Sequence, residues 1–425
     1  MRANRRLWLS VAILCALYFV SYVDRLILAL VADAVKADLL LSDAQLALLI
    51  GLAFAAAYAS LGLAAGWIAD RVNRPLLISA GALVWGGSTI ASAYSTSFTS
   101  LLVLRMGVAV GEALLTPATI SLLADLFEGR RRTLATSMYL SAGVAGGACA
   151  YLVGAGALLA AEHFAGQFAF LPTQSWRLCL IMVGAPAVLL GLLLALVLRD
   201  PSRRTNGGVR SGVYRHLCEN GRVYVPVFLA TPLVQLATFS FSAWYPSFLH
   251  RTYDYSLPEA GFLFGMAAAL GGVAGTILGP NLAAARGGGP ARALSLAGRW
   301  ALLAVPLCIA APLASQPIAG IIFAGLALAL TLGVGAFPPI IVQMLAPPDA
   351  RAFLTALYSL LLSIIGFGGA PLLVTVASRL ASPEPSLALG IAIVASGGCL
   401  IGGSVLWLAG AYNASVSPAP RSTHA

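Results

Sequence analysis

Four ionisable side chains lie in two stretches of the sequence that are otherwise apolar. Asp24 and Arg25 are neighbours near the end of the first apolar stretch, and Arg105 and Glu112 belong to a later one at about residues 98–126. A charged side chain inside hydrocarbon costs at least ~2.5–3.5 kcal/mol on insertion scales. Such residues therefore mark, by default, a pathway, a proton site or a substrate site.

The spacing of these residues predicts that they share one site if their two helices adjoin. Residues seven positions apart lie on nearly the same face of an α-helix, about 10 Å apart along its axis, so Arg105 and Glu112 differ in depth. If the first stretch runs outward and the fourth inward, Asp24 and Arg25 reach about the depth of Arg105. Arginine stays charged and presents a planar fork suited to carboxylate or phosphate. A buried carboxylate beside it can bind and release a proton. The pattern thus predicts an anion site coupled to a proton site, with two structural ion pairs as the alternative.

The composition indicates a membrane protein with many spans. Hydrophobic residues make up 60% of the 425 residues and charged residues only 9%, against about 45–50% and 25% in soluble domains. Continuous apolar runs without period-2 alternation indicate helices and not a barrel. We predict an all-α membrane protein with twelve spans, at residues 8–30, 44–68, 76–95, 98–126, 133–160, 176–198, 223–249, 260–285, 293–313, 317–345, 352–378 and 386–411.

The net charge of +10 is spread unevenly over the loops. Arginines gather before the first span, in the loops after the second, fourth and eighth spans, and in the central loop. The loops of the opposite side carry few bases, namely Lys36, Arg177, Arg251 and Arg379. This asymmetry follows the positive-inside rule. It predicts a multi-pass plasma membrane protein (bacterial inner membrane) with both termini cytoplasmic, and its basicity gives no indication of nucleic acid binding.

The predicted organisation is two groups of six spans joined by a basic cytoplasmic linker. The boundaries are residues 1–198 for an N-terminal six-helix bundle, 199–222 for the linker and 223–411 for a C-terminal six-helix bundle, with a disordered tail at 412–425. In such a layout, substrate and ion sites lie near the midplane between the halves. Cleavage of the first span as a signal peptide is disfavoured because that span is too long and many more follow.

Other classes of function leave no signal in the sequence. The cysteines show no metal-ligand spacing and the four histidines suggest no metal motif, so we expect neither a metal nor a cofactor. A phosphate-binding loop of the type G-x-x-x-x-G-K-[ST] is absent, which disfavours a primary pump. We expect the energy source to be a proton gradient. An enzyme would need a set of catalytic residues, and a sensor would normally carry a soluble signalling domain. The sequence suggests neither, so we expect neither an enzyme nor a sensor.

The loop after the second span reads Gly66-Trp67-Ile68-Ala69-Asp70-Arg71-Val72-Asn73-Arg74. This order of Gly, Asp-Arg and Arg between two spans resembles the signature loop of the major facilitator superfamily, with Asn73 in place of the usual second glycine. In the second half, residues 286–292 keep the bases of this loop but lack the acid. With the six-plus-six layout, the resemblance covers nearly the whole chain.

The resemblance implies a cytoplasmic gate. Asp70 is expected near the N-terminus of the eleventh span, where the helix dipole favours an anion. Arg71 is expected to reach Asp125 at the inner end of the fourth span, and Arg74 is included among the gate residues. The alternative is a solvated loop that only sets topology.

Within the superfamily, several further segments resemble two related groups, the spinster-like transporters of lysolipids and sphingoid lipids and the anion:cation symporters of organic acids and sugar acids. The segments are Tyr22-Val23-Asp24-Arg25, Arg105…Gly111-Glu112…Pro117, Trp176-Arg177 and Phe241…Trp244…Pro246…Phe248-Leu249…Arg251. The Gly-rich fifth span and the sequence from Arg105 to Glu112 favour the spinster-like group. In both groups the acids of spans one and four are implicated in proton coupling and the arginines in anion binding. Here these are Asp24 and Glu112, and Arg25 and Arg105.

The second half contributes polar but uncharged candidates. We expect Gln235, Trp244 and Tyr358 to contact substrate, although an aromatic belt at the outer interface explains Trp244 and its neighbours more simply than a binding site does. A site charged on one side and apolar on the other suits an amphipathic anion, so we predict a proton-coupled transporter of a lysolipid or sphingoid lipid. We expect a monomer in the lipid bilayer with a small-molecule or lipid substrate. An organic-acid or sugar-acid:proton symporter is the alternative. A drug efflux antiporter is disfavoured because the fifth span lacks the expected proline.

Overall fold

The computed structural model describes residues 2–69, 71–167, 172–198, 200–201, 213–285, 289–347 and 350–416. The chain forms two compact units. Unit 1 consists of Met1–Asn206 with Ser242–Ala269, and unit 2 consists of Gly207–Phe241 with Leu270–Ala425. Unit 1 therefore includes residues 242–269 from the second half of the sequence. The sequence-based division instead places the whole second half, from residue 223, in the C-terminal bundle.

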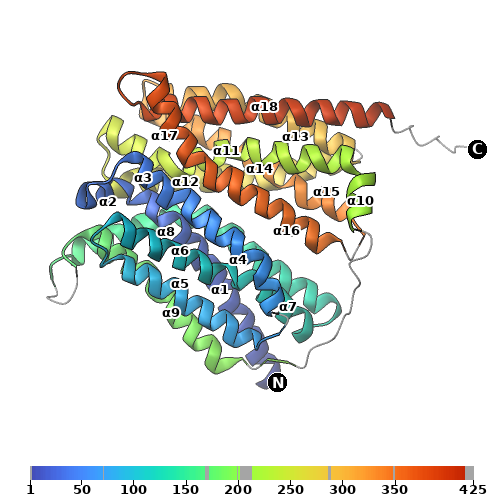
Figure 1. The fold of residues 1–425 in the computed structure, drawn as a ribbon, viewed down its shortest axis with the longest axis horizontal. Coiled ribbons are helices and arrows are strands. Elements are labelled where there is room, and N and C mark those ends of the chain that lie inside the picture. Colours follow the sequence, from blue (N-terminus) through green and yellow to red (C-terminus); the bar gives the residue numbers. More distant parts are fainter. Residues whose placement is uncertain are drawn as a thin grey trace, which may run out of the picture. The chain divides into compact units, whose positions relative to one another are not determined.

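Every regular element in the described residues is a helix (Figure 1). Unit 1 contains α1 (Arg2–Leu30), α2 (Ala32–Leu39), α3 (Asp43–Ala47), η1 (Leu48–Leu52), α4 (Ala53–Ala69), α5 (Arg74–Ser92), α6 (Phe98–Ala113), α7 (Leu115–Leu126), α8 (Gly129–Phe164) and α9 (Ser175–Val197). Unit 2 contains α10 (Val213–Glu219), α13 (Pro290–Leu313), α14 (Pro317–Gly335), α15 (Phe337–Leu345), α16 (Arg351–Leu361), η2 (Leu362–Gly368), α17 (Gly369–Ala381) and α18 (Leu387–Val416). Two helices, α11 (Gly221–Tyr253) and α12 (Leu257–Ala285), contribute residues to both units.

Twelve helical segments of the described chain are long and apolar enough to cross a membrane. This confirms the predicted all-α membrane protein with twelve spans. The ends differ in detail: residues 213–219 and 221–222 of the predicted linker are helical, and α18 continues to Val416, past the predicted end at residue 411. The rest of the predicted tail lies outside the described residues.

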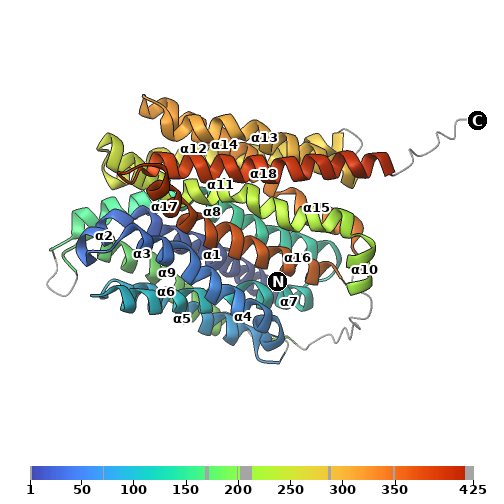
Figure 2. The ribbon, with the colours of Figure 1, turned by 45° about the horizontal axis from the view of Figure 1, so that its top comes forward.

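Glycines in α8 bring this helix close to α1, its neighbour in unit 1 (Figure 2). Gly143 faces the ring of Tyr18, and a Cβ on Gly146 would lie 2.6 Å from the carbonyl oxygen of Phe19. Because a side chain at either position would push α1 away, these glycines fix the distance between the helices. This confirms the packing role predicted for the glycines of the fifth span at Gly143, Gly146, Gly147 and Gly154, which all face α1; a Cβ on Gly156 would have nothing within 4 Å.

Four spans are interrupted, which the apolar pattern does not reveal. The fourth span breaks at Leu114 between α6 and α7, and the tenth breaks at Ala336 between α14 and α15. Prolines explain both interruptions, since Pro117 and Pro338 lack the N–H that would bond the carbonyl four residues earlier. The second and eleventh spans contain the π-helical turns η1 and η2, a geometry that is frequent at functional sites.

A pair of glycine variants tests the α1–α8 contact. We expect Gly146→Ala to lower the melting temperature of the detergent-solubilised protein, because the added methyl group collides with backbone and overpacking costs about 1–3 kcal/mol. Gly156→Ala on the same helix is the control and should leave the melting temperature unchanged or raise it slightly. Equal melting temperatures for the two variants would show that the two helices tolerate separation.

Candidate substrate and coupling site

An ion pair between Arg25 of α1 and Glu112 of α6 forms the centre of the site. Arg25 donates to the Glu112 Oε2 atom from Nη2 at 2.6 Å and from Nε at 3.2 Å. The Glu112 side chain is 1% exposed and that of Arg25 is 19% exposed. The pair therefore places one fully buried acid beside a base that keeps a partly open face.

A second pair lies beside the first. The Arg105 Nη1 atom is 3.8 Å from the Asp24 Oδ1 atom, and Arg105 Nη2 donates to the main-chain oxygen of Arg25 at 3.3 Å. The Thr89 hydroxyl of α5 donates to Asp24 Oδ2 at 2.6 Å. The Asp24 and Arg105 side chains are 0% and 3% exposed. The predicted convergence of two acids and two arginines is thus confirmed, with the pairings Arg25–Glu112 and Asp24–Arg105.

Aromatic rings surround the Arg25 guanidinium. Its central carbon lies 5.0 Å from the ring centre of Tyr22, 4.9 Å from that of Phe54 and 5.1 Å from that of Tyr58. The Phe54 ring also lies 5.7 Å from the Arg105 guanidinium carbon. These distances fall within the range of cation–π attraction, which is about 6 Å. The charged cluster is therefore lined on one side by ring faces from α1 and α4.

Several buried polar atoms of the cluster have no hydrogen-bond partner among the described residues. They are Asp24 Oδ1, Arg105 Nε and Glu112 Oε1. A buried polar atom without a partner costs about 1–3 kcal/mol, so one such atom in each of three neighbouring side chains is unusual in a purely structural network. The two carboxylate oxygens can accept a proton or a hydrogen bond, and the Arg105 Nε–H group can donate to a water molecule or a ligand.

Close helix contacts position the cluster. A Cβ on Gly81 of α5 would lie 2.8 Å from the carbonyl oxygen of Gly111 of α6, so these helices meet where only glycines fit. Glu112 follows Gly111 directly and lies just before the break at Leu114. Sequence reasoning missed Thr89 and the three rings. Two signals were present, since Tyr22 precedes Arg25 by three residues and Phe54 precedes Tyr58 by four, both spacings that share a helix face.

A second buried cluster centres on Arg74 at the start of α5. Its Nη1 atom binds Asp125 and the Ser121 hydroxyl, and its Nε atom donates to Asp200 Oδ1 at 2.8 Å. Asn73 caps α5 by accepting a hydrogen bond from the Leu76 N–H at 3.0 Å, which gives the residue that replaces a glycine a local role. Among the predicted gate residues, the structure pairs Arg74 with Asp125 and adds Asp200, which was not predicted. Arg71 is exposed, and Asp70 lies outside the described residues.

The three candidates from the second half have different surroundings. Gln235 is buried and bonds within unit 2, donating to the Thr331 main-chain oxygen at 3.1 Å and accepting from the Thr238 hydroxyl at 2.7 Å. The Tyr358 hydroxyl is buried without a hydrogen-bond partner among the described residues. Trp244 is fully buried.

The aromatic belt expected around Trp244 is wrong. Trp244, Tyr245 and Phe248 are all buried, whereas belt residues face the lipid headgroups. The Trp244 ring instead lies 5.8 Å from the Arg251 guanidinium carbon.

Twelve membrane-crossing helices and a buried charge cluster define a polytopic membrane transport protein. Residues 14–370 match the family model of the Major Facilitator Superfamily, and the chain belongs to that family. It is 27% identical over 418 residues to an MFS-type efflux pump of Mycolicibacterium smegmatis, covering 96% of this chain and 93% of that protein. It is 27% identical over 259 residues to Protein spinster homolog 3 of Danio rerio, covering 59% of this chain and 49% of that protein.

A solved structure agrees with these relatives. The chain matches a bacterial homolog of the human lysosomal transporter Spinster, in an inward-facing and unoccupied conformation, with a TM-score of 0.80, 26% identity and 96% of each chain covered. The spinster-like group predicted from the sequence is thereby confirmed.

The Arg74 cluster generates a stability prediction. Because Arg74→Gln leaves the Asp125 and Asp200 carboxylates without their base, we expect a loss of about 3–5 kcal/mol, the usual cost of breaking a buried pair. Thermal unfolding measures this loss. Arg132→Gln, which removes an exposed charge from α8, should change the melting temperature little. Adding Asp200→Asn to Arg74→Gln should recover part of the loss, and no recovery would contradict the pairing.

Proposed function

We propose that the protein is a secondary active transporter that works by alternating access and is driven by protons, with an amphipathic anion as substrate. The observation that carries the proposal is the buried Arg25–Glu112 pair, in which the base keeps an open face and the acid does not. An anion that reaches this site meets a guanidinium whose other partner is a carboxylate able to take up a proton. Binding of substrate and binding of a proton are then linked through one residue.

The two arginines have different parts in this proposal. Arg25 is the substrate anchor because its side chain is the more exposed of the two and its fork suits a phosphate or carboxylate. Arg105 supports the anchor by donating to the Arg25 main-chain oxygen and by facing Asp24. Loss of Arg105 therefore acts on substrate binding through the position of Arg25.

The two acids are the proposed proton sites. Protonation of Glu112 removes the charge that holds Arg25 and so frees the guanidinium for an anionic substrate. Asp24 is balanced by Arg105 and by the Thr89 hydroxyl, so its protonation would loosen Arg105 in the same manner. No cofactor takes part, and the proton gradient supplies the energy.

The substrate class rests on chemistry and on relatives. The ring faces of Tyr22, Phe54 and Tyr58 beside Arg25 offer apolar contact next to a fixed positive charge, which suits a headgroup attached to a hydrocarbon chain. The spinster-like relatives favour a lysolipid or sphingoid lipid. We further propose a monomer in the bacterial inner membrane with both termini cytoplasmic, as the distribution of arginines indicates.

A second candidate function is export of a small molecule. It is favoured by the relative named as an efflux pump, which matches nearly the full length of both chains. An organic-acid:proton symporter would use the same Arg25 and Glu112 chemistry. Proteoliposomes with an imposed pH gradient, offered a lysophospholipid, a sphingoid base and several organic acids, separate these candidates by which compound moves and in which direction.

Replacement of Glu112 tests proton coupling. We expect Glu112→Gln to abolish transport driven by a pH gradient while exchange of substrate across the membrane continues, because a neutral amide mimics the permanently protonated acid. Glu162→Gln, which neutralises an exposed acid on α8, is the matched control and should transport as wild type. Gradient-driven transport that survives Glu112→Gln would remove the proton role from this residue.

Replacement of Arg25 tests the anchor. We expect Arg25→Lys to weaken binding of the transported anion roughly 10–100-fold, because the ammonium keeps the charge but loses a bidentate contact with an energy of about 1.5–3 kcal/mol. Arg105→Lys should have a smaller effect. Isothermal titration of the purified, monodisperse variants measures both affinities, and an unchanged affinity in Arg25→Lys would make the residue structural.

A further inference from the structure

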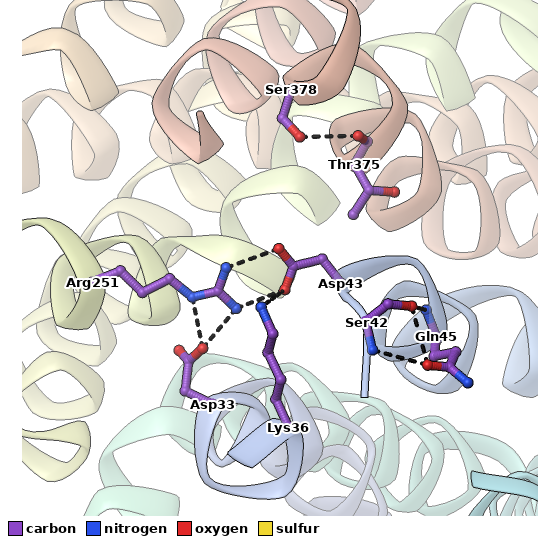
Figure 3. Close-up of polar contacts among 8 residues, drawn as sticks. All are labelled: Asp33, Lys36, Ser42, Asp43, Gln45, Arg251, Thr375 and Ser378. Atoms are coloured by element: carbon purple, nitrogen blue, oxygen red, sulfur yellow. Dashed lines mark hydrogen bonds and ion pairs between the residues drawn. The ribbon is translucent and has the colours of Figure 1, made fainter. Parts of the chain in front are cut away.

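A four-residue charge cluster joins the α2–α3 segment, which follows α1, to the end of α11 (Figure 3). Arg251 of α11 donates to Asp33 Oδ1 from Nε at 2.7 Å, and to Asp43 Oδ2 from Nη1 at 3.0 Å. Its Nη2 atom lies 2.6 Å from Asp33 Oδ1 and 2.9 Å from Asp43 Oδ1. Lys36 binds the same Asp43 Oδ1 atom at 2.7 Å. One guanidinium thus bridges two acids, and one of these acids is shared with a second base.

The α2–α3 segment that carries Asp33 and Asp43 is also held by contacts that do not involve Arg251. Asp38 of α2 accepts from the Arg177 Nη2 atom at 2.7 Å and from the Trp176 ring N–H at 3.2 Å, which ties α2 to the start of α9. Arg177 also donates to the main-chain oxygens of Ala93 and Ser95, both at 2.8 Å. Asp43 opens α3 behind a reciprocal cap formed by Ser42 and Gln45. The α2–α3 segment is therefore anchored without Arg251. Arg251 can leave the cluster while these other contacts remain.

Lys36 lies close to both acids of the cluster. It lies three residues after Asp33 on α2, a spacing at which side chains on a helix meet. The Asp33 Oδ2 atom is buried and has no hydrogen-bond partner among the described residues. With Arg251 present, the two acids are balanced by two bases. Without Arg251, Lys36 still binds Asp43 and lies at a helix spacing that favours contact with Asp33.

We propose that Arg251 is a latch that holds the end of α11 on the α2–α3 segment, and that Lys36 is a functional residue of the transport cycle that neutralises Asp33 and Asp43 when Arg251 leaves. The proposal rests on the alternating access proposed above and on the proposed orientation, which places α2 and α3 on the outer side of the membrane. In the proposed opening of that side, the end of α11 parts from α2–α3. Lys36 lowers the cost of this step because it prevents two carboxylates from being left together without a base.

The proposal predicts effects of opposite sign for two losses of positive charge. Arg251→Gln removes the latch and favours the open outer side. Lys36→Gln leaves the latch in place but removes its replacement, and so disfavours the open side. A cluster that only stabilises the fold would respond to both losses in the same direction, which makes the difference in sign the decisive result.

A reporter cysteine measures the open fraction. Ser247 lies one turn before Arg251 on α11 and is fully buried, so Ser247→Cys in a background without the six native cysteines reacts with an impermeant maleimide only when the outer side opens. We expect Arg251→Gln, which breaks two ion pairs, to raise the labelling rate roughly tenfold, and Lys36→Gln, which breaks one, to lower it roughly threefold. Shifts of this size are what partly exposed ion pairs produce. Arg379→Gln, which removes an exposed positive charge from α17, should leave the rate unchanged.

The remaining outcomes are also decisive. Faster labelling in both Arg251→Gln and Lys36→Gln, or no change in either, would overturn the proposal. If Arg251→Gln is not monodisperse, Arg251→Lys provides the same test with a smaller increase, and faster hydrogen exchange of residues 32–47 provides a second measure. Labelling needs neither substrate nor proton gradient, so an error in the proposed substrate or coupling leaves these expectations intact. Absence of labelling in wild type and every latch variant would contradict alternating access itself.

Discussion

The pairing of Arg25 with Glu112 constrains how the helices of the N-terminal unit pack, because neither charge is tolerable alone among apolar helices. Each acid of the central cluster faces an arginine, and Thr89 supplies a further hydrogen bond to Asp24. These contacts require α1, α5 and α6 to approach closely. Gly81 and Gly111 allow close approach between α5 and α6, and the glycines of α8 allow α8 to pack closely against α1. Much of the small-residue content of the unit can be understood as the geometry that charge balance demands.

The fully buried charged residues of the described chain all belong to this unit. They are Asp24, Arg74, Arg105 and Glu112. The buried polar groups of the second unit are instead neutral, and several are joined by hydrogen bonds, such as those among Gln235, Thr238 and Thr331. The Gln235 amide also fills the space beside Gly335, next to the break between α14 and α15. Gln235 therefore supports an interrupted helix, and the substrate contact predicted for it stays a prediction.

The sequence was sufficient for the fold and for the four central residues, because both follow from strong signals. Apolar runs define spans, and a charge within such a run is conspicuous. The pairing pattern depends on how each helix is rotated about its own axis, which the sequence alone does not determine. Arg71 was the expected partner of Asp125, and the structure pairs Arg74 with it. The ring cluster around Arg25 was missed because aromatic residues are common in membrane helices. The π-helical turn η1 precedes Phe54 and Tyr58 and shifts the register of their faces, so no regular 3.6-residue pattern predicts where they point.

The three rings around Arg25 also bear on what happens whenever Glu112 is neutral. A guanidinium that loses its carboxylate in a low-dielectric interior normally becomes an isolated charge with a large desolvation cost. Here the electron-rich faces of Tyr22, Phe54 and Tyr58 remain, and each such face attracts a desolvated cation by up to about 2 kcal/mol. These ring faces therefore offset part of the cost of leaving Arg25 unpaired. A guanidinium with such neighbours can change its anionic partner at a lower cost than one surrounded by aliphatic side chains alone.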